Sequence, residues 1–140
     1  MLVLDANILI RAALGRRVRQ LLVLYGGSVQ FFAPEVAFAE AREHLPEILS
    51  RRQISVAEGL TVLNLLSEIV QSIGVDAYAV FEEAARKRLM GRDLEDWPIL
   101  AAALALDCPI WTEDTDFFGA GVATWTTDRV ELFLESAGSA

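Results

Sequence analysis

The sequence predicts an α/β fold, a three-layer α/β/α sandwich around a short, mainly parallel central sheet. Short apolar runs bounded by turn residues alternate along the chain with segments of helical periodicity, and strands separated by helices pair in parallel. The 140 residues are 54% hydrophobic, enough to fill one sizeable core. Because no repeat, low-complexity tract or linker interrupts the sequence, we expect a single domain over residues 1–140.

The first predicted elements are a buried strand, a pair of helices and a second strand. Residues 2–4 form an apolar run that ends at Asp5. Residues 7–25 have helical spacing, with an interruption at Gly15 and a stop at two glycines. Residues 29–32 predict the second strand.

Two further helices are predicted in the middle of the chain. Pro34 suits the first turn of a helix that runs to about Leu49, because its missing amide hydrogen has no helical partner there. Ser55 and Glu58 form a capping-box pattern, which predicts a helix through about Ser72.

The C-terminal half continues the alternation of strands and helices. We expect a very short strand at residues 73–75 and a helix from Asp76 to Gly91. A helix over residues 96–106 has Pro98 in its first turn. The last predicted elements are strands at 109–112 and 122–124 and a terminal helix at 129–136.

Several carboxylates stand where the predicted strands end. Asp5 ends the first strand, and Asp114 follows the 109–112 strand by two residues. In open α/β sheets, ligands bind beyond the carboxyl ends of the strands, near the switch in strand order. If these two strands are neighbours at the switch, both acids face one crevice. Asp93, Asp96 and Glu40 lie on neighbouring loops and helices.

Carboxylates that share a crevice repel one another, at roughly 4 kcal/mol for a pair 4 Å apart with an effective dielectric near 20. They stay ionised together only if a cation neutralises them. Oxygen ligands without a Cys or His cluster favour magnesium or manganese, and such a site suits phosphodiester chemistry. Each acid also has a simpler interpretation as a helix cap, a turn residue or a surface charge.

Four blocks of the sequence resemble the PIN-domain family of nucleases, in order and spacing, over most of the chain. The blocks are residues 2–10, 34–40, 93–101 and 110–117. One departure is Ala6, where the family usually has Thr or Ser. The resemblance implies a PIN-like nuclease domain, in which the four family acids match Asp5, Glu40, Asp96 and Asp114.

The resemblance implies an endoribonuclease that uses Mg²⁺ or Mn²⁺ to hydrolyse phosphodiester bonds of single-stranded RNA through a water molecule that magnesium activates. The four family acids are then the catalytic metal ligands. Asp93 and Asp116 are candidates for a second metal or for the outer shell. Candidates for positioning the substrate are Asn7 and Thr112, by hydrogen bonding, and Arg86, Lys87, Arg88 and Arg92, as a track for the RNA backbone.

Many members of this family are toxins of toxin–antitoxin pairs, so the resemblance also implies a homodimer and an antitoxin protein as partner. We expect a cytoplasmic protein without a membrane partner, since the longest apolar run is about ten residues and the single cysteine suits a reducing compartment. The net charge of −8 counts against an RNA partner, although two divalent ions would halve it. Basic residues cluster at 16–19, 51–52 and 86–92, either as solvated helix faces or as phosphate contacts.

Two other functions stay open. The first is a non-catalytic module that binds RNA or protein on a PIN-like fold. The second, weaker one is a phosphatase or phosphoryl-transfer domain that uses Asp5, although Asn7 stands where the common Asp-x-Asp motif needs an acid.

Overall fold

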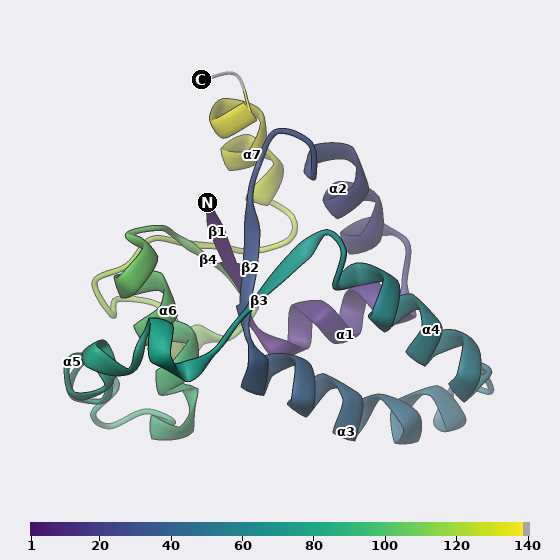
Figure 1. Cartoon of the computed structure of the whole chain (residues 1–140), viewed down its shortest axis with the longest axis horizontal. Helices are drawn as coiled ribbons and strands as arrows, with labels where there is room; N and C mark the ends of the chain where they lie inside the picture. Colours follow the sequence, from purple (N-terminus) through teal and green to yellow (C-terminus); the bar gives the residue numbers. More distant parts are fainter. Residues whose placement is uncertain (139–140) are drawn as a thin grey trace.

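A computed structural model describes residues 1–138 and contains a five-stranded sheet in which each strand pair is parallel. The spatial order of the strands is β3-β2-β1-β4-β5. This confirms the predicted three-layer α/β/α class (Figure 1). The strands are β1 (Leu2–Leu4), β2 (Phe31–Pro34), β3 (Val70–Ile73), β4 (Ile110–Trp111) and β5 (Thr124–Trp125).

The switch in strand order lies between β1 and β4. The chain first moves outward from β1 through β2 to β3, then returns past β1 to β4 and β5. Leu4 of β1 pairs with Trp111 of β4, so the carboxyl ends of these two strands are neighbours. Helices cover both faces of the sheet (Figure 1). One side carries α1 (Ala6–Leu14), α2 (Arg17–Tyr25), α3 (Glu35–Arg51) and α4 (Val56–Leu66), the other carries α5 (Glu82–Arg88) and α6 (Trp97–Leu106), and α7 (Val130–Gly138) lies beside α2.

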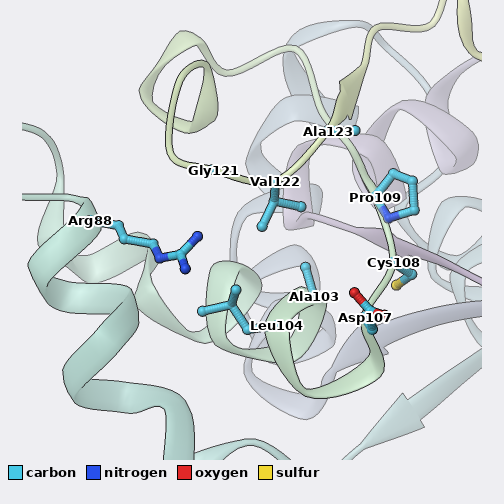
Figure 2. Close-up of a pocket in the computed structure, with 9 residues that line it drawn as sticks. All are labelled: Arg88, Ala103, Leu104, Asp107, Cys108, Pro109, Gly121, Val122 and Ala123. Carbon is cyan, nitrogen blue, oxygen red and sulfur yellow. The ribbon is translucent and has the colours of Figure 1, made fainter.

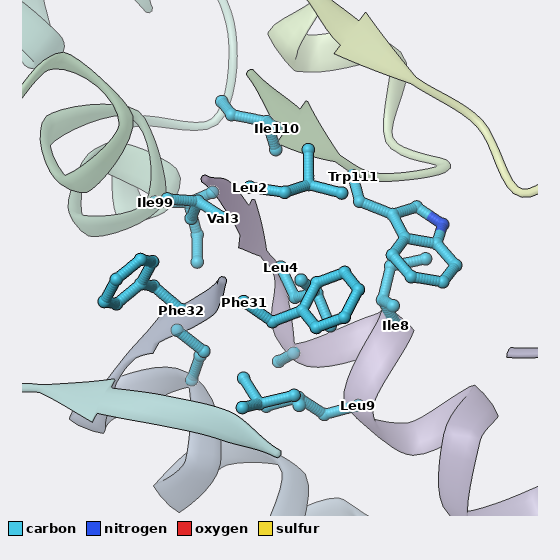
Figure 3. Packing of buried hydrophobic residues seen from close by; sticks show 14 of the residues in the cluster. Leu2, Val3, Leu4, Ile8, Leu9, Phe31, Phe32, Ile99, Ile110 and Trp111 are labelled. Atoms are coloured by element: carbon cyan, nitrogen blue, oxygen red, sulfur yellow. The ribbon is translucent and has the colours of Figure 1, made fainter. Parts of the chain in front are cut away.

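The core forms because side chains alternate across the pleated sheet. Leu4, Phe31 and Trp111 share one face, and the rings of Phe31 and Trp111 lie 6.3 Å apart between centroids. Val3 points to the opposite face, toward Ile99 of α6 (Figure 3). All five side chains are buried. Layers on both faces of β1 therefore hold the strand that ends at Asp5.

The predicted helices on either side of Gly15 are confirmed as α1 and α2. Pro34 is the last residue of β2 and the N-cap of α3, one position before the first turn in which it was expected. Its backbone is extended, with ψ of 148°. The helix that it begins also continues through Pro46 to Arg51.

The helix predicted to reach Ser72 was too long. Helix α4 begins at the Ser55 cap as expected, where the Ser55 hydroxyl accepts from the Glu58 amide, but it ends at Leu66. The strand β3 occupies Val70–Ile73 and not residues 73–75, because its backbone completes four residue pairs with β2. Pairing with a neighbouring strand overrides local helical spacing, and single-sequence periodicity does not contain that information.

The prediction of a single helix from Asp76 to Gly91 was also wrong. Two short 3₁₀ turns, Val75–Ala77 and Ala79–Phe81, precede α5. The interruption is at Tyr78, which is only 1% exposed and whose ring lies edge-on to Trp97 at 5.7 Å. Burial of this ring takes the backbone out of the helical region, with φ of −131° and ψ of −1°.

The C-terminal elements agree with the prediction apart from small shifts. Asp96 caps α6, and Pro98 lies in its first turn. Strand β5 lies two residues later than expected, since Thr124 and Trp125 pair with β4. No helix in residues 1–138 combines the length and the apolar character that crossing a bilayer requires.

Candidate metal centre

Asp5 and Thr112 meet at the carboxyl ends of β1 and β4. Each residue directly follows its strand, and the strands are neighbours, so the two side chains lie together. The Thr112 hydroxyl donates a hydrogen bond to Oδ2 of Asp5. Asp5 is 6% exposed and Thr112 is fully buried. Residues 107 positions apart in the sequence therefore form one buried polar contact.

The second oxygen of Asp5 holds the start of α1. Its Oδ1 accepts from the Ile8 amide at 3.0 Å, which caps the helix. The pKa of Asp5 is raised from 3.8 to about 6, chiefly by burial; the hydrogen bonds from Thr112 and Ile8 lower it, and repulsion by Asp114 and Glu40 raises it. The fold thus places a carboxylate where its charge is unfavourable without a cation.

Thr112 also fixes the loop that carries Asp114. Its Oγ1 accepts from the Asp114 amide at 2.9 Å, and Oδ1 of Asp114 accepts from the Asp116 amide at 2.9 Å. Asp114 therefore caps the short 3₁₀ turn Thr115–Phe117. These bonds hold Asp114 in a defined conformation beside Asp5.

Asp96 reaches the same region from the N-terminus of α6. Its Oδ2 is buried and has no hydrogen-bond partner among the described residues. The pKa of Asp96 is raised to about 7, chiefly by burial and then by the charges of Asp114, Asp93, Asp116 and Asp5, in that order. A buried carboxylate oxygen without a partner costs free energy unless a ligand or a proton satisfies it.

These acids line one small pocket of about 40 Å³, which has room for a single ion or water molecule. Glu40, on the exposed face of α3, also lines it. The structure thus brings together the four acids expected from the sequence. The lining residues are Asp5, Ala6, Asn7, Glu40, Asp96, Ile99 and Asp114.

The two secondary acids, Asp93 and Asp116, lie close to Asp96. Carboxylate oxygens of Asp93, Asp96 and Asp116 all lie within 4.8 Å of one another, a spacing that suits a shared cation. Asp93 is exposed, and its Oδ1 accepts from the Glu95 amide at 3.0 Å. Asp96 therefore belongs to both acidic groups.

A larger cleft of about 500 Å³ shares Glu40 and Asp96 with the small pocket. Two residues that the sequence interpretation gave no role, Glu43 and His44, line this cleft from α3. The available signal was their spacing, since positions three and four residues after Glu40 lie on the same helix face.

The four basic residues expected to contact RNA differ in their surroundings. Arg88 donates to the Ala120 carbonyl at 3.1 Å, and Arg92 donates to the Asp116 carbonyl at 2.7 Å. Arg86 bonds Glu82 at 2.8 Å and lies over the Trp97 ring. These contacts tie the α5 region to its neighbours. The RNA track itself stays a prediction, as does the role of the exposed Lys87.

A third pocket of about 420 Å³ lies at the opposite edge of the sheet, among residues that precede β4 and β5. Figure 2 shows the Arg88 side chain directed toward Leu104 and Val122, with Cys108 and Pro109 on the far side. This pocket lies at the amino ends of the strands, away from the acids that follow them.

The donor set of the acidic pocket fits a hard divalent cation. Its ionisable ligands are all carboxylates, which Mg²⁺ and Mn²⁺ prefer, and no Cys or His lines it. A cation bound among these acids would give the buried Oδ2 of Asp96 a partner and would favour the ionised forms of Asp5 and Asp96, whose pKa values are raised.

A protein-family model described as PIN domain matches residues 3–135, nearly the whole chain. The match includes both acidic groups, strands β2 to β5 and the last two residues of β1. No curated protein matches the chain significantly.

Proposed function

The chain belongs to the PIN-domain family, and from this premise we propose that it is a metal-dependent endoribonuclease that hydrolyses phosphodiester bonds of single-stranded RNA. One observation carries the proposal above the others. The buried Oδ2 of Asp96 has no partner in the described residues, and Asp96 lines a pocket that three further carboxylates also line. Such a group of acids is stable in the ionised form only with a cation between them.

We assign Mg²⁺, or Mn²⁺, to this pocket, with Asp5, Glu40, Asp96 and Asp114 as direct or water-mediated ligands. When bound, the ion would polarise the scissile phosphate and lower the pKa of the attacking water. The chain has no obvious covalent nucleophile among these residues, so hydrolysis by water fits them best.

The residues around the acids hold them in position for this role. Thr112 orients Asp5 and the Asp114 backbone at once, because one hydroxyl donates to the first and accepts from the second. It also supplies a hydroxyl in contact with Asp5, whereas Ala6 supplies none. Asn7 is exposed beside the pocket and is assigned to a phosphate oxygen.

Asp93 and Asp116 form the second part of the proposed centre. Their oxygens approach Asp96 closely enough to hold a second ion or to orient water around the first. The proposal does not depend on which of these roles they have.

The test is cleavage of labelled single-stranded RNA with Mg²⁺, with Mn²⁺ and with EDTA. We expect cutting with either metal, none in EDTA, and at least a hundredfold loss in Asp96→Asn, since removal of a charged partner in a catalytic site typically costs several kcal/mol. Asp76→Asn, an exposed residue of the first 3₁₀ turn, is the matched control. RNA that binds and is never cut with any metal would establish the non-catalytic module instead.

We also propose that the protein is a toxin with an antitoxin partner, that it forms a homodimer, that it is cytoplasmic, and that residues 1–140 form a single nuclease domain. The family resemblance supports the toxin role, the antitoxin partner and the homodimer. Growth arrest on expression of the wild type, but not of Asp96→Asn, would support the toxin role. Sedimentation of the purified chain tests the dimer.

A further inference from the structure

A cleft of about 490 Å³ lies where α1 ends and α2 begins, and four arginines line it. Arg11 is in the last turn of α1, Arg16 and Arg17 are at the start of α2, and Arg52 follows α3. Three separate segments of the sequence thus contribute one third of the twelve basic residues to a single cleft. The cleft therefore carries a local positive charge, although the net charge of the chain is −8.

The guanidinium groups are exposed and largely free of acidic partners. Arg17 bonds Glu131 at 3.1 Å, and Glu131 also accepts from Tyr25. Within residues 1–138, Arg11, Arg16 and Arg52 form no ion pair. The start of α2 adds backbone N–H groups, because its N-cap makes no side-chain bond. Exposed arginines and free helix N–H groups are both donors that phosphate oxygens accept.

The cleft lies at the same edge of the sheet as the acidic pocket. Thr127 lines the cleft and follows β5 by two residues. Its amide donates to Glu113 at 2.7 Å, and Glu113 is the residue before Asp114. On the other side, α1 begins at Asp5 and has nine residues, so at 1.5 Å per residue its far end lies on the order of 13 Å away.

We propose that this arginine cleft binds backbone phosphates of single-stranded RNA on one side of the bond that the acidic pocket cleaves. The inference rests on the proposed function and deepens it by placing the path of the substrate. A short run of nucleotides spans the distance along α1. The same arginines compensate locally for the overall negative charge, which otherwise repels a polyanion.

The cleft is a better phosphate site than the predicted track at α5. Arg86, Arg88 and Arg92 each already bond a protein oxygen. Phosphate would have to compete with those bonds, whereas the side chains of Arg11, Arg16 and Arg52 bond no protein oxygen within residues 1–138.

The experiment measures binding of a fluorescein-labelled single-stranded RNA by anisotropy in EDTA, over a series of salt concentrations. The test variant is Arg16→Gln/Arg52→Gln, and the matched control is Arg42→Gln/Arg129→Gln, which removes the same charge at exposed positions outside the cleft. Thermal unfolding of each variant verifies that it is folded.

We expect the slope of log K against log salt to become shallower by about 1.4 in the cleft variant, since each lost single-strand phosphate contact removes about 0.7. The control should keep the wild-type slope. Equal slopes in the wild type and both variants would overturn the inference. So would a cleft variant that loses binding of poly-glutamate but not of RNA, because the cleft would then be a site for an acidic protein segment.

The two proposals fail in different ways. If the salt slope of RNA binding falls in the cleft variant but the wild type cuts no RNA with any metal, the proposed catalysis is contradicted and the cleft proposal is supported. A chain that cuts RNA with an unchanged salt slope in the cleft variant contradicts the cleft alone.

Discussion

Replacement of Asp5 by asparagine should stabilise the metal-free protein at neutral pH while it abolishes cleavage. Asp5 is 6% exposed, and its pKa is raised from 3.8 to about 6. A raised carboxyl pKa means that the folded state binds protons more tightly than the unfolded state. The contribution of Asp5 to stability is therefore full below pH 3.8, decreases between pH 3.8 and about 6, and stays lost above that range.

The magnitude follows from the pKa shift. One pKa unit corresponds to about 1.4 kcal/mol, so ionisation of Asp5 destabilises the metal-free fold by about 3 kcal/mol. The asparagine amide carries no charge and can still accept from the Ile8 amide. It no longer accepts from the Thr112 hydroxyl, which costs about 1 kcal/mol. The net gain at pH 8 is then about 2 kcal/mol.

The assay is thermal unfolding in EDTA at pH 8 and pH 4. We expect Asp5→Asn to unfold roughly 6–8 °C above the wild type at pH 8, the usual scale for about 2 kcal/mol in a chain of this size. The advantage should vanish at pH 4. Addition of Mg²⁺ should stabilise the wild type at pH 8 and leave the variant unchanged.

Asp76→Asn is the matched control, because Asp76 is exposed. Its melting temperature should equal that of the wild type at both pH values. An Asp5→Asn protein that is less stable than the wild type in EDTA at pH 8 would refute the reasoning, because the ionised Asp5 would then stabilise the fold without a cation.

Three further predictions concern the surroundings of the site and the end of α6. Thr112→Val should lower the free energy of unfolding by about 1–3 kcal/mol in urea titrations, because it removes a buried hydroxyl that bonds both Asp5 and the Asp114 amide. Thr112→Ser keeps the hydroxyl and should retain most of the wild-type stability. Arg92→Lys keeps the positive charge beside the acids but not the guanidinium geometry of the 2.7 Å bond to the Asp116 carbonyl. Mn²⁺ affinity measured by calorimetry should fall several-fold with little change in melting temperature, and an unchanged affinity would contradict the role of this bond. Asp107→Gly should raise stability by up to about 1 kcal/mol, since Asp107 has a left-handed φ of 51° at the end of α6, and a loss of stability would show that its side chain is needed there.

Much of the fold could be predicted because local patterns and tertiary structure agree in most elements. The apolar run before Asp5, the glycine at position 15 and Pro98 each mark an element boundary that the structure shows. The errors arose where a distant contact decides the local structure. Tyr78 breaks a helical pattern because its ring is buried against Trp97, and β3 forms where β2 offers a partner.

The candidate site could be predicted as a set of acids but not as a geometry. The rule that parallel strands end at one edge of the sheet predicts from the sequence alone that Asp5 and Asp114 lie together. The double role of Thr112 depends on the register of β1 against β4, which the sequence does not state. The arginine cleft could not be foreseen either, because Arg11 lies in α1 and Arg52 follows α3, and the two meet only after folding.

Anomalous diffraction at the manganese absorption edge, from crystals soaked in Mn²⁺, shows whether a divalent ion binds among the acids that follow the separate strands. We expect an anomalous peak in the small pocket, at about 2.0–2.3 Å from carboxylate oxygens that include those of Asp96 and Asp114. A second peak between Asp93 and Asp116 would be compatible with this expectation. Crystals in which manganese binds elsewhere, while the Asp96 carboxylate faces only water or a proton, would contradict it.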